Sequence, residues 1–232
     1  MMRRSTILAA AAAAALHTSS ANAVAVGQVD NFEDGTTQNW IVGLLGAPHP
    51  APPTNVPSGG PGGAGDAYLQ LASFGGGGAG SKLAVINLAQ WAGDYTSTGV
   101  TGISADVRNF GPTEVALRLY LENPENGPPT DSAITPAVFL APGGDWTSLS
   151  FSLAPGDLTV LSGSVATLLG GVTALRFFHG AADTFPGESL IALIGVDNVR
   201  ALGAERVPEP ASLALLGLGL AGLGLRRRRR VA

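Results

Sequence analysis

Short runs in which apolar and polar residues alternate recur through the central part of this sequence, and Gly- and Pro-rich stretches separate them. Alternation with a period of two residues indicates a strand that has one buried and one solvated face. The expected strands cover residues 68–72, 82–88, 102–109 (GISADVRN), 114–122 (EVALRLYLE), 146–153 (WTSLSFSL), 174–179 and 190–202. Many short strands joined by turns predict an all-β fold, an antiparallel jelly-roll-like β-sandwich.

Helical spacing in the central region is limited to Leu158, Leu161, Val165 and Leu168, which predicts one short helix. Two glycine-rich segments, residues 47–65 and 75–80, each contain a formal G-x-G-x-x-G pattern. A dinucleotide site needs that pattern between a strand and a helix. Pro61 interrupts the first match and an expected strand follows the second, so both segments are predicted to be loops.

The first 23 residues have the layout of a secretory signal peptide. Arg3 and Arg4 form a positive region, an apolar stretch follows from Ile7 to Leu16, and Ala21-Asn22-Ala23 is an A-x-A cleavage site. We expect a signal helix, removed by signal peptidase after Ala23, with Ala25 as the alternative position. The chain is then divided into a signal peptide (1–23), one sandwich domain (24–206) and a terminal segment (207–232).

The terminal segment reads VPEPASLALLGLGLAGLGLRRRRRVA and has three parts in a fixed order. A Val-Pro-Glu-Pro sequence is followed by an apolar run from Ala211 to Leu225 and then by five arginines. The residues concerned are Val207, Pro208, Glu209, Pro210, Arg226, Arg227, Arg228, Arg229 and Arg230. This order closely resembles the PEP-CTERM sorting signal of Gram-negative bacteria, which implies an exosortase as partner, processing near the Pro-Glu-Pro, and delivery to the cell surface or extracellular matrix.

The apolar run is compatible with a transmembrane helix that holds the protein before processing. Its 15 residues would span about 22 Å as a helix, which is short against a bilayer core of about 30 Å. The arginines should stay in the cytoplasm and leave the rest of the chain outside. Two alternatives are a permanent anchor and a buried core helix, although a core helix would need five arginines solvated at its end.

The terminal segments hold seven of the 13 basic residues and one of the 17 acidic residues. Residues 24–206 therefore retain six basic and 16 acidic residues, a net charge near −10. Such a body is a poor partner for nucleic acid or anionic lipid, which require clustered Lys and Arg, and suits divalent cations or neutral glycans. The chain has no cysteine, and the central region is long enough to bury a core without disulfides.

Catalytic motifs are scarce, and we expect no enzymatic activity. The central region has two histidines, His49 and His179, and it lacks the G-x-S-x-G and H-E-x-x-H patterns. His179 ends an apolar strand, where a structural role is more common. A Ser-His-Asp site built from distant residues, or a glycosidase using two of the 16 carboxylates, stays open as an alternative.

A calcium site is predicted from carboxylates near the two ends of the sandwich. Glu33 and Asp34 lie in the segment DNFEDG, Asp197 lies in VDN, and Asp66 could add a ligand. Calcium prefers six to eight oxygen ligands, and first and last strands of a jelly roll commonly lie side by side. The alternative is a plain turn, for which Asp, Asn and Gly are typical.

An opening FEDG followed by Trp40 and a closing VDN strand resembles jelly-roll carbohydrate-binding modules. That resemblance implies a structural calcium ion as cofactor. Residues 91–123 also resemble surface proteins with the same C-terminal signal, whose bodies look like laminin-type or carbohydrate-binding sandwiches. Both resemblances point to an exported protein associated with matrix polysaccharide.

Glycan binding by such a module would require exposed aromatic rings, on which sugars stack. Tyr120 and Trp146 lie on the polar phases of their strands and are the predicted glycan-binding residues, whereas Trp40 is expected in the core. Three functions therefore remain open: a structural matrix protein, a calcium-stabilised carbohydrate-binding module, and a secreted glycan hydrolase.

Overall fold

The structure is a computed structural model that describes residues 23–43, 49–124 and 128–204. The expected signal helix, the cleavage-site residue Ala21, and the whole segment 207–232 with its expected transmembrane helix lie outside these residues. Within the described ranges, no helix is both long enough and apolar enough to cross a membrane.

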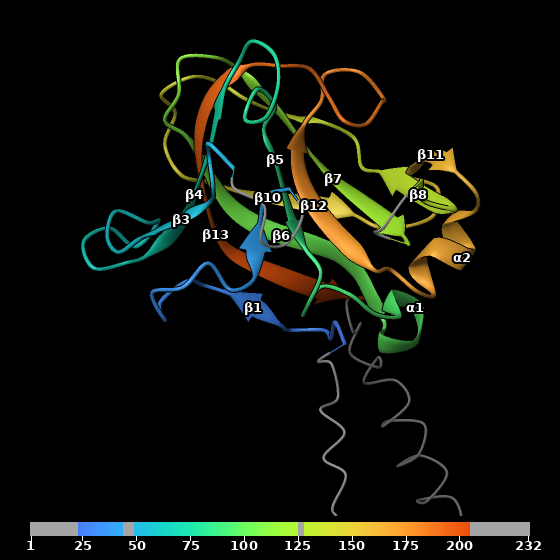
Figure 1. Ribbon diagram of the computed structural model, residues 1–232. Helices are drawn as coiled ribbons and strands as arrows, with labels where there is room; N and C mark the ends of the chain where they lie inside the picture. The colour runs from blue at the N-terminus through green and yellow to red at the C-terminus, as the bar shows by residue number, and fades with distance from the viewer. Residues whose placement is uncertain (1–22, 44–48, 125–127, 205–232) are drawn as a thin grey trace, which may run out of the picture.

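Two antiparallel sheets face each other in a sandwich (Figure 1). One sheet has the order β10 (Thr147–Ser152), β6 (Val100–Asn109), β13 (Ile191–Gly203), β4 (Tyr68–Phe74) and β3 (Thr54–Val56), with β1 (Val29–Asp30) also paired to β13. The other has the order β11 (Thr159–Ser162), β8 (Asp131–Ile134), β7 (Val115–Asn123), β12 (Ala174–His179), β5 (Ala84–Asn87) and β2 (Trp40–Ile41), with β9 (Val138–Leu140) paired to β7. The predicted antiparallel sandwich is confirmed.

The alternating pattern decides which side chains enter the core between the sheets. Ile103, Ala105 and Val107 of β6 are buried there, while the residues between them point to the outer face of the six-stranded sheet. In β7, Leu117, Leu119 and Leu121 do the same from the opposite sheet. Trp40 is fully buried, as expected.

On the outer face of the seven-stranded sheet, the side chains of β7 are also buried, which alternation alone did not predict. Arg118, Tyr120 and Glu122 of β7 point outward, yet all three are buried. The loop that follows β12 contributes to the cover, because Phe185 stacks on Tyr120 with ring centroids 4.0 Å apart. In the same loop, Asp183 pairs with Arg118 at 2.8 Å.

Residues 158–168 differ from the single short helix expected there. Thr159–Ser162 form strand β11, and the helix α2 (Val165–Leu169) begins only afterwards. Ser164 caps α2 by accepting a hydrogen bond from the Thr167 backbone N–H. A second short helix, α1 (Tyr95–Thr98), is capped by Asp94 in the same way. Of the two glycine-rich segments predicted to be loops, residues 75–80 form turns and bends, whereas in the segment 47–65 only part is loop, because Thr54–Val56 form strand β3.

The first and last strands lie side by side, with Asp30 opposite Val199. Just before β1, the Gly27 N–H donates to the Ala201 carbonyl at 2.9 Å. The described chain therefore begins and ends at the same end of the sandwich (Figure 1). This adjacency is the one that the calcium prediction required.

Candidate functional site

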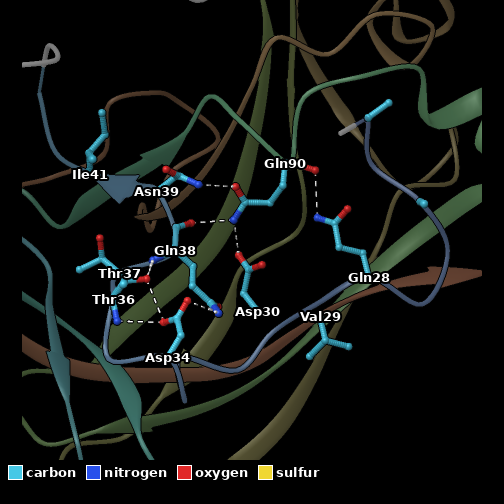
Figure 2. A pocket seen from close by; sticks show the side chains of 12 residues that line it. Gln28, Val29, Asp30, Asp34, Thr36, Thr37, Gln38, Asn39, Ile41 and Gln90 are labelled. Atoms are coloured by element: carbon cyan, nitrogen blue, oxygen red, sulfur yellow. Dashed lines mark hydrogen bonds between the residues drawn. The ribbon is translucent and has the colours of Figure 1, made fainter. Parts of the chain in front are cut away.

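A cavity with a volume of about 820 Å³ lies beside β1. Its wall comes from β1, from the loop between β1 and β2, and from the segment before α1 (Figure 2). We call it the amide pocket, after the side chains Gln28, Asp30, Asp34, Gln38, Asn39 and Gln90. Thr36 and Thr37 add two hydroxyl groups.

Gln90 organises the amide pocket through hydrogen bonds that Figure 2 shows as dashed lines. Its Nε2 donates to Asp30 Oδ2 at 3.0 Å and to the Gln38 carbonyl at 2.6 Å. Its Oε1 accepts from Asn39 Nδ2 at 3.0 Å, and its backbone carbonyl accepts from Gln28 Nε2 at 2.9 Å. These hydrogen bonds therefore hold the amide groups in fixed orientations.

Asp30 connects the amide pocket to the core. Its Oδ2 accepts hydrogen bonds from the indole N–H groups of Trp40, at 2.8 Å, and Trp91, at 2.7 Å. Burial raises the pKa of Asp30, and the hydrogen bonds from Trp91, Trp40 and Gln90 oppose that rise. Two buried tryptophans thus fix the position of one carboxylate at the base of the pocket.

The loop that forms the pocket rim has an unusual backbone. Gln38 and Asn39 have positive φ angles of 47° and 63°, a region that non-glycine residues seldom occupy. Asp34 helps hold this turn by accepting from the Thr36 N–H and hydroxyl, both at 2.9 Å, and from Gln38 Nε2. Hydrogen bonding to the Thr36 backbone lowers the pKa of Asp34.

Four carboxylates gather near one end of the outer face of the six-stranded sheet, and we call Glu33, Asp66, Asp106 and Asp197 the acidic cluster. Asp197 lies opposite Asp106 in the β13–β6 pairing and is only 1% exposed. Burial raises the pKa of Asp197 to about 7, a hydrogen bond from the Asn198 N–H opposes the rise, and the charges of Asp66, Asp106 and Glu33 add to it. Two of the other predicted calcium ligands, Glu33 and Asp66, therefore lie within electrostatic reach of Asp197.

Hydrogen bonds to nearby groups already occupy some of these oxygens. Glu33 Oε1 accepts from the Ala67 N–H at 2.9 Å, and Asn198 Nδ2 donates to Asp106 Oδ2, also at 2.9 Å. Within the described part of the chain, no three Asp, Glu or His side chains form a group that could hold a metal ion. Oxygen donors of this kind suit calcium, but the cluster is not a preformed coordination shell. Asp34 contributes to the amide pocket instead.

The two predicted glycan-binding aromatics lie in different settings. Tyr120 is 3% exposed beneath Phe185, so the expectation that it faces solvent is wrong. Trp146 is half-buried and forms an aromatic patch with Tyr68 and Phe110, at centroid distances of 5.3 and 5.9 Å. Its Nε1 donates to the Gly59 carbonyl, and a Cβ on Gly195 would lie 2.6 Å from its ring.

The two histidines have local hydrogen-bond partners. His179 Nδ1 accepts from the Ala116 N–H at 3.0 Å, and its Nε2 lies 3.6 Å from Glu188. Burial lowers the pKa of His179, and Glu188 partly offsets that effect. His49 Nδ1 accepts from the Ala51 N–H at 3.2 Å.

Comparison with known families identifies the C-terminal segment. Residues 206–229 match the PEP-CTERM protein-sorting motif. The chain carries this sorting signal. The signal implies processing by an exosortase, with membrane anchoring through the C-terminus beforehand. No curated protein matches the chain in sequence.

Solved structures show the fold of the body. An exo-β-agarase is similar with a TM-score of 0.55 and 13% identity, over 79% of this chain and 26% of the agarase. The chain thus spans about a quarter of that enzyme. The carbohydrate-binding module CtCBM11 is similar with a TM-score of 0.51 and 17% identity, over 78% of this chain and 97% of the module. A family 11 carbohydrate-binding module from Clostridium thermocellum was solved with a β-1,3-1,4-mixed-linked tetrasaccharide. It is similar with a TM-score of 0.49 and 14% identity, over 78% of this chain and 98% of the module.

The amide pocket was not predicted from the sequence. The two tryptophans that support it each follow a side-chain amide, in Asn39-Trp40 and Gln90-Trp91. These paired sequences were the available signal, but 51 residues separate Asn39 from Gln90. Only the adjacency of β1, β2 and the segment before α1 brings them together.

Proposed function

We propose that this protein is a non-catalytic surface or matrix protein that binds exopolysaccharide through the amide pocket after exosortase delivers it. The sorting signal supports export and anchoring through the C-terminus, followed by release to the surface or matrix of a Gram-negative bacterium. The jelly-roll sandwich supports a carbohydrate-binding role. The observation that carries the proposal is the preordered set of amides around Gln90.

Sugar hydroxyls both donate and accept hydrogen bonds, and side-chain amides offer both functions in one plane. The amide pocket places four side-chain amides and two threonine hydroxyls around one cavity of about 820 Å³. That volume lies within the range of small-molecule sites, roughly 300–1,000 Å³. Because the network is already ordered, a ligand does not have to freeze these side chains when it binds.

A catalytic role has less support. A glycosidase requires two carboxylates beside its substrate, one of them with a raised pKa. Asp197 has a raised pKa, but it is almost completely buried and lines neither the amide pocket nor the cavity beside Lys82. Asp30 also has a raised pKa and lines the amide pocket, but it is buried and its Oδ2 already accepts hydrogen bonds from Trp40, Trp91 and Gln90.

Co-sedimentation of the full chain with the exopolysaccharide of its source bacterium tests the proposal. The chain is kept in a zwitterionic detergent that contains no sugar. Gln28→Ala removes one amide from the pocket, and Gln70→Ala is the matched control, because Gln70 is also half-buried but lies on the outer face beside the aromatic patch.

We expect the Gln28 variant to pellet less with polysaccharide and the Gln70 variant to pellet like the wild type. If only Gln70→Ala or Trp146→Ala reduces pelleting with polysaccharide, the glycan site lies at the aromatic patch instead. No pelleting by the wild type would favour a structural matrix protein.

We further propose calcium as a structural ion of the acidic cluster, with Glu33, Asp66, Asp106 and Asp197 as its carboxylates. The support is chemical: burial is the main cause of the raised pKa of Asp197, and a cation would relieve the repulsion from Asp66, Asp106 and Glu33 that adds to that rise. Binding would require these side chains to converge, so calcium should act on stability as well as on local structure.

A further inference from the structure

A second cavity, of about 320 Å³, opens on the outer face of the seven-stranded sheet. His49, Lys82 and Arg176 contribute basic side chains to its wall. Ala84 and Ile86 of β5, which alternate with the core residue Val85, line it with apolar surface. We call it the cationic cavity.

The charge of this cavity contrasts with that of the protein around it. Residues 24–206 have six Lys and Arg residues against 16 acidic ones. Two of those six, Lys82 and Arg176, line this one cavity. An anion is repelled by the net charge of the body, so a local cationic site is where it can be held.

Neighbouring groups hold both cations in place. Arg176 Nε donates a hydrogen bond to Glu122 Oε1 at 2.9 Å, and Arg176 Nη2 donates to the same oxygen. Its guanidinium lies 5.4 Å from the centre of the Phe185 ring. Lys82 Nζ donates to the Pro186 carbonyl at 3.0 Å. These bonds use two of the three Arg176 nitrogens and one of the three Lys82 protons, so each cation retains donors for a ligand.

The third basic side chain is also oriented. His49 Nδ1 accepts from the Ala51 N–H, which places the proton of the neutral ring on Nε2 and makes that atom a donor. Glu122 offsets the charge of Arg176, so Lys82 supplies the main uncompensated charge. The cavity therefore suits a single anionic group with a small apolar face beside it.

We propose that the cationic cavity binds the carboxylate of a uronate residue in an acidic polysaccharide. The carboxylate accepts hydrogen bonds from Lys82, Arg176 and His49, and the apolar face of the sugar ring packs on Ala84 and Ile86. A volume of about 320 Å³ is near the lower limit for ligand sites and suits one sugar residue. This site is separate from the amide pocket, and its ligand is charged rather than neutral.

Binding of trigalacturonate to the full chain tests the assignment, with its methyl ester as the neutral match and a sulfated trisaccharide as the second anion. Dissociation constants are measured by microscale thermophoresis in a sugar-free zwitterionic detergent. Lys82→Gln removes the main charge, and Arg200→Gln removes an exposed cation from the other sheet as the matched control. Gln28→Ala, from the amide pocket, separates the two sites.

We expect trigalacturonate to bind roughly tenfold more tightly than its ester, and Lys82→Gln to weaken it by a similar factor, as for one charge-assisted hydrogen bond. Arg200→Gln and Gln28→Ala should leave that binding unchanged. Equal binding of acid and ester, equal losses in the Lys82 and Arg200 variants, or no binding would overturn the proposal. Tighter binding of the sulfated sugar would overturn the carboxylate assignment. None of these results would bear on neutral glycan binding at the amide pocket.

Discussion

The indole nitrogen of Trp91 lies 2.7 Å from Oδ2 of Asp30, a residue 61 positions earlier in the chain. The same oxygen accepts a hydrogen bond from the Trp40 indole N–H. One buried carboxylate therefore connects β1 of the six-stranded sheet with β2 of the seven-stranded sheet. Asp30→Ala would leave two buried indole N–H groups without their acceptor, at about 1–3 kcal/mol for each unsatisfied donor. Urea denaturation should show this loss, while Asp157→Ala, at an exposed position, should change stability little. Equal stability of the two variants would contradict the role of Asp30.

Val24 is fully buried in the core cluster, and its N–H donates to the Ala92 carbonyl at 3.0 Å. A cut after Ala23 keeps this residue, whereas a cut after Ala25 removes it. We therefore expect N-terminal sequencing of the mature protein to begin at Val24. A chain beginning at Val26 should be less stable by about 1.5–3 kcal/mol, the value of one buried valine. A natural N-terminus at Val26 would refute the assignment.

His179 should make the protein less stable in mild acid. Its pKa is lowered in the folded state, so the unfolded chain binds the proton more readily. The contribution of neutral His179 to the free energy of unfolding is complete above the ordinary histidine pKa. It is lost as the pH falls through that value toward the lowered pKa of the folded state. His179→Asn retains an acceptor for the Ala116 N–H without the titrating ring.

The difference in unfolding free energy between wild type and His179→Asn should therefore change between pH 7 and pH 5, to the disadvantage of the wild type. The wild type must be compared with His179→Asn at each pH, because Asp30 and Asp197 titrate in both proteins. Their raised pKa values increase the free energy of unfolding as the pH falls, which is opposite to the effect of His179. A difference that does not vary with pH would show that His179 keeps an ordinary pKa.

Calcium should raise the melting temperature of the full chain, and EDTA should reverse the effect. A site at a hundredfold excess of ligand over its dissociation constant gains about 2.7 kcal/mol. Asp197→Asn should abolish the shift, whereas Asp145→Asn, at an exposed position, should preserve it. A shift of equal size with magnesium, or in the Asp197 variant, would argue against a calcium site in the acidic cluster.

Phe185→Ala tests the covered face of the seven-stranded sheet, because it removes the ring that stacks on Tyr120. We expect lower stability from the lost packing and no change in co-sedimentation with exopolysaccharide. If co-sedimentation increases instead, the uncovered Tyr120 is itself a glycan-binding residue, as its place on the polar phase of β7 predicted.

Local alternation predicted strands β4, β5, β6, β7, β10, β12 and β13, because each of them has one face in the core. It did not predict strands β1, β2, β3, β8, β9 and β11. It failed at Tyr120, since the outer face of β7 is covered by a ring 65 positions later in the chain. It also failed at Thr159–Ser162, where pairing with β8 prevails over helical spacing.

The calcium site predicted from strand order consisted of Glu33, Asp34, Asp66 and Asp197. The acidic cluster contains three of these residues, without Asp34, and it adds Asp106. That residue reaches Asp197 only through the β6–β13 register, which sequence alone does not determine. The same limit applies to the amide pocket, whose residues come from three separate segments.

The position of β13 directly before the sorting motif has a mechanical consequence. The sorting motif begins at residue 206, and β13 ends at Gly203. While the protein is held by its C-terminus, any pull along the tail therefore acts on β13. This strand is 13 residues long and lies between β6 and β4. A force along β13 loads its hydrogen bonds to both neighbours in shear, so many bonds share the load and the sandwich resists extraction until the tether is cut.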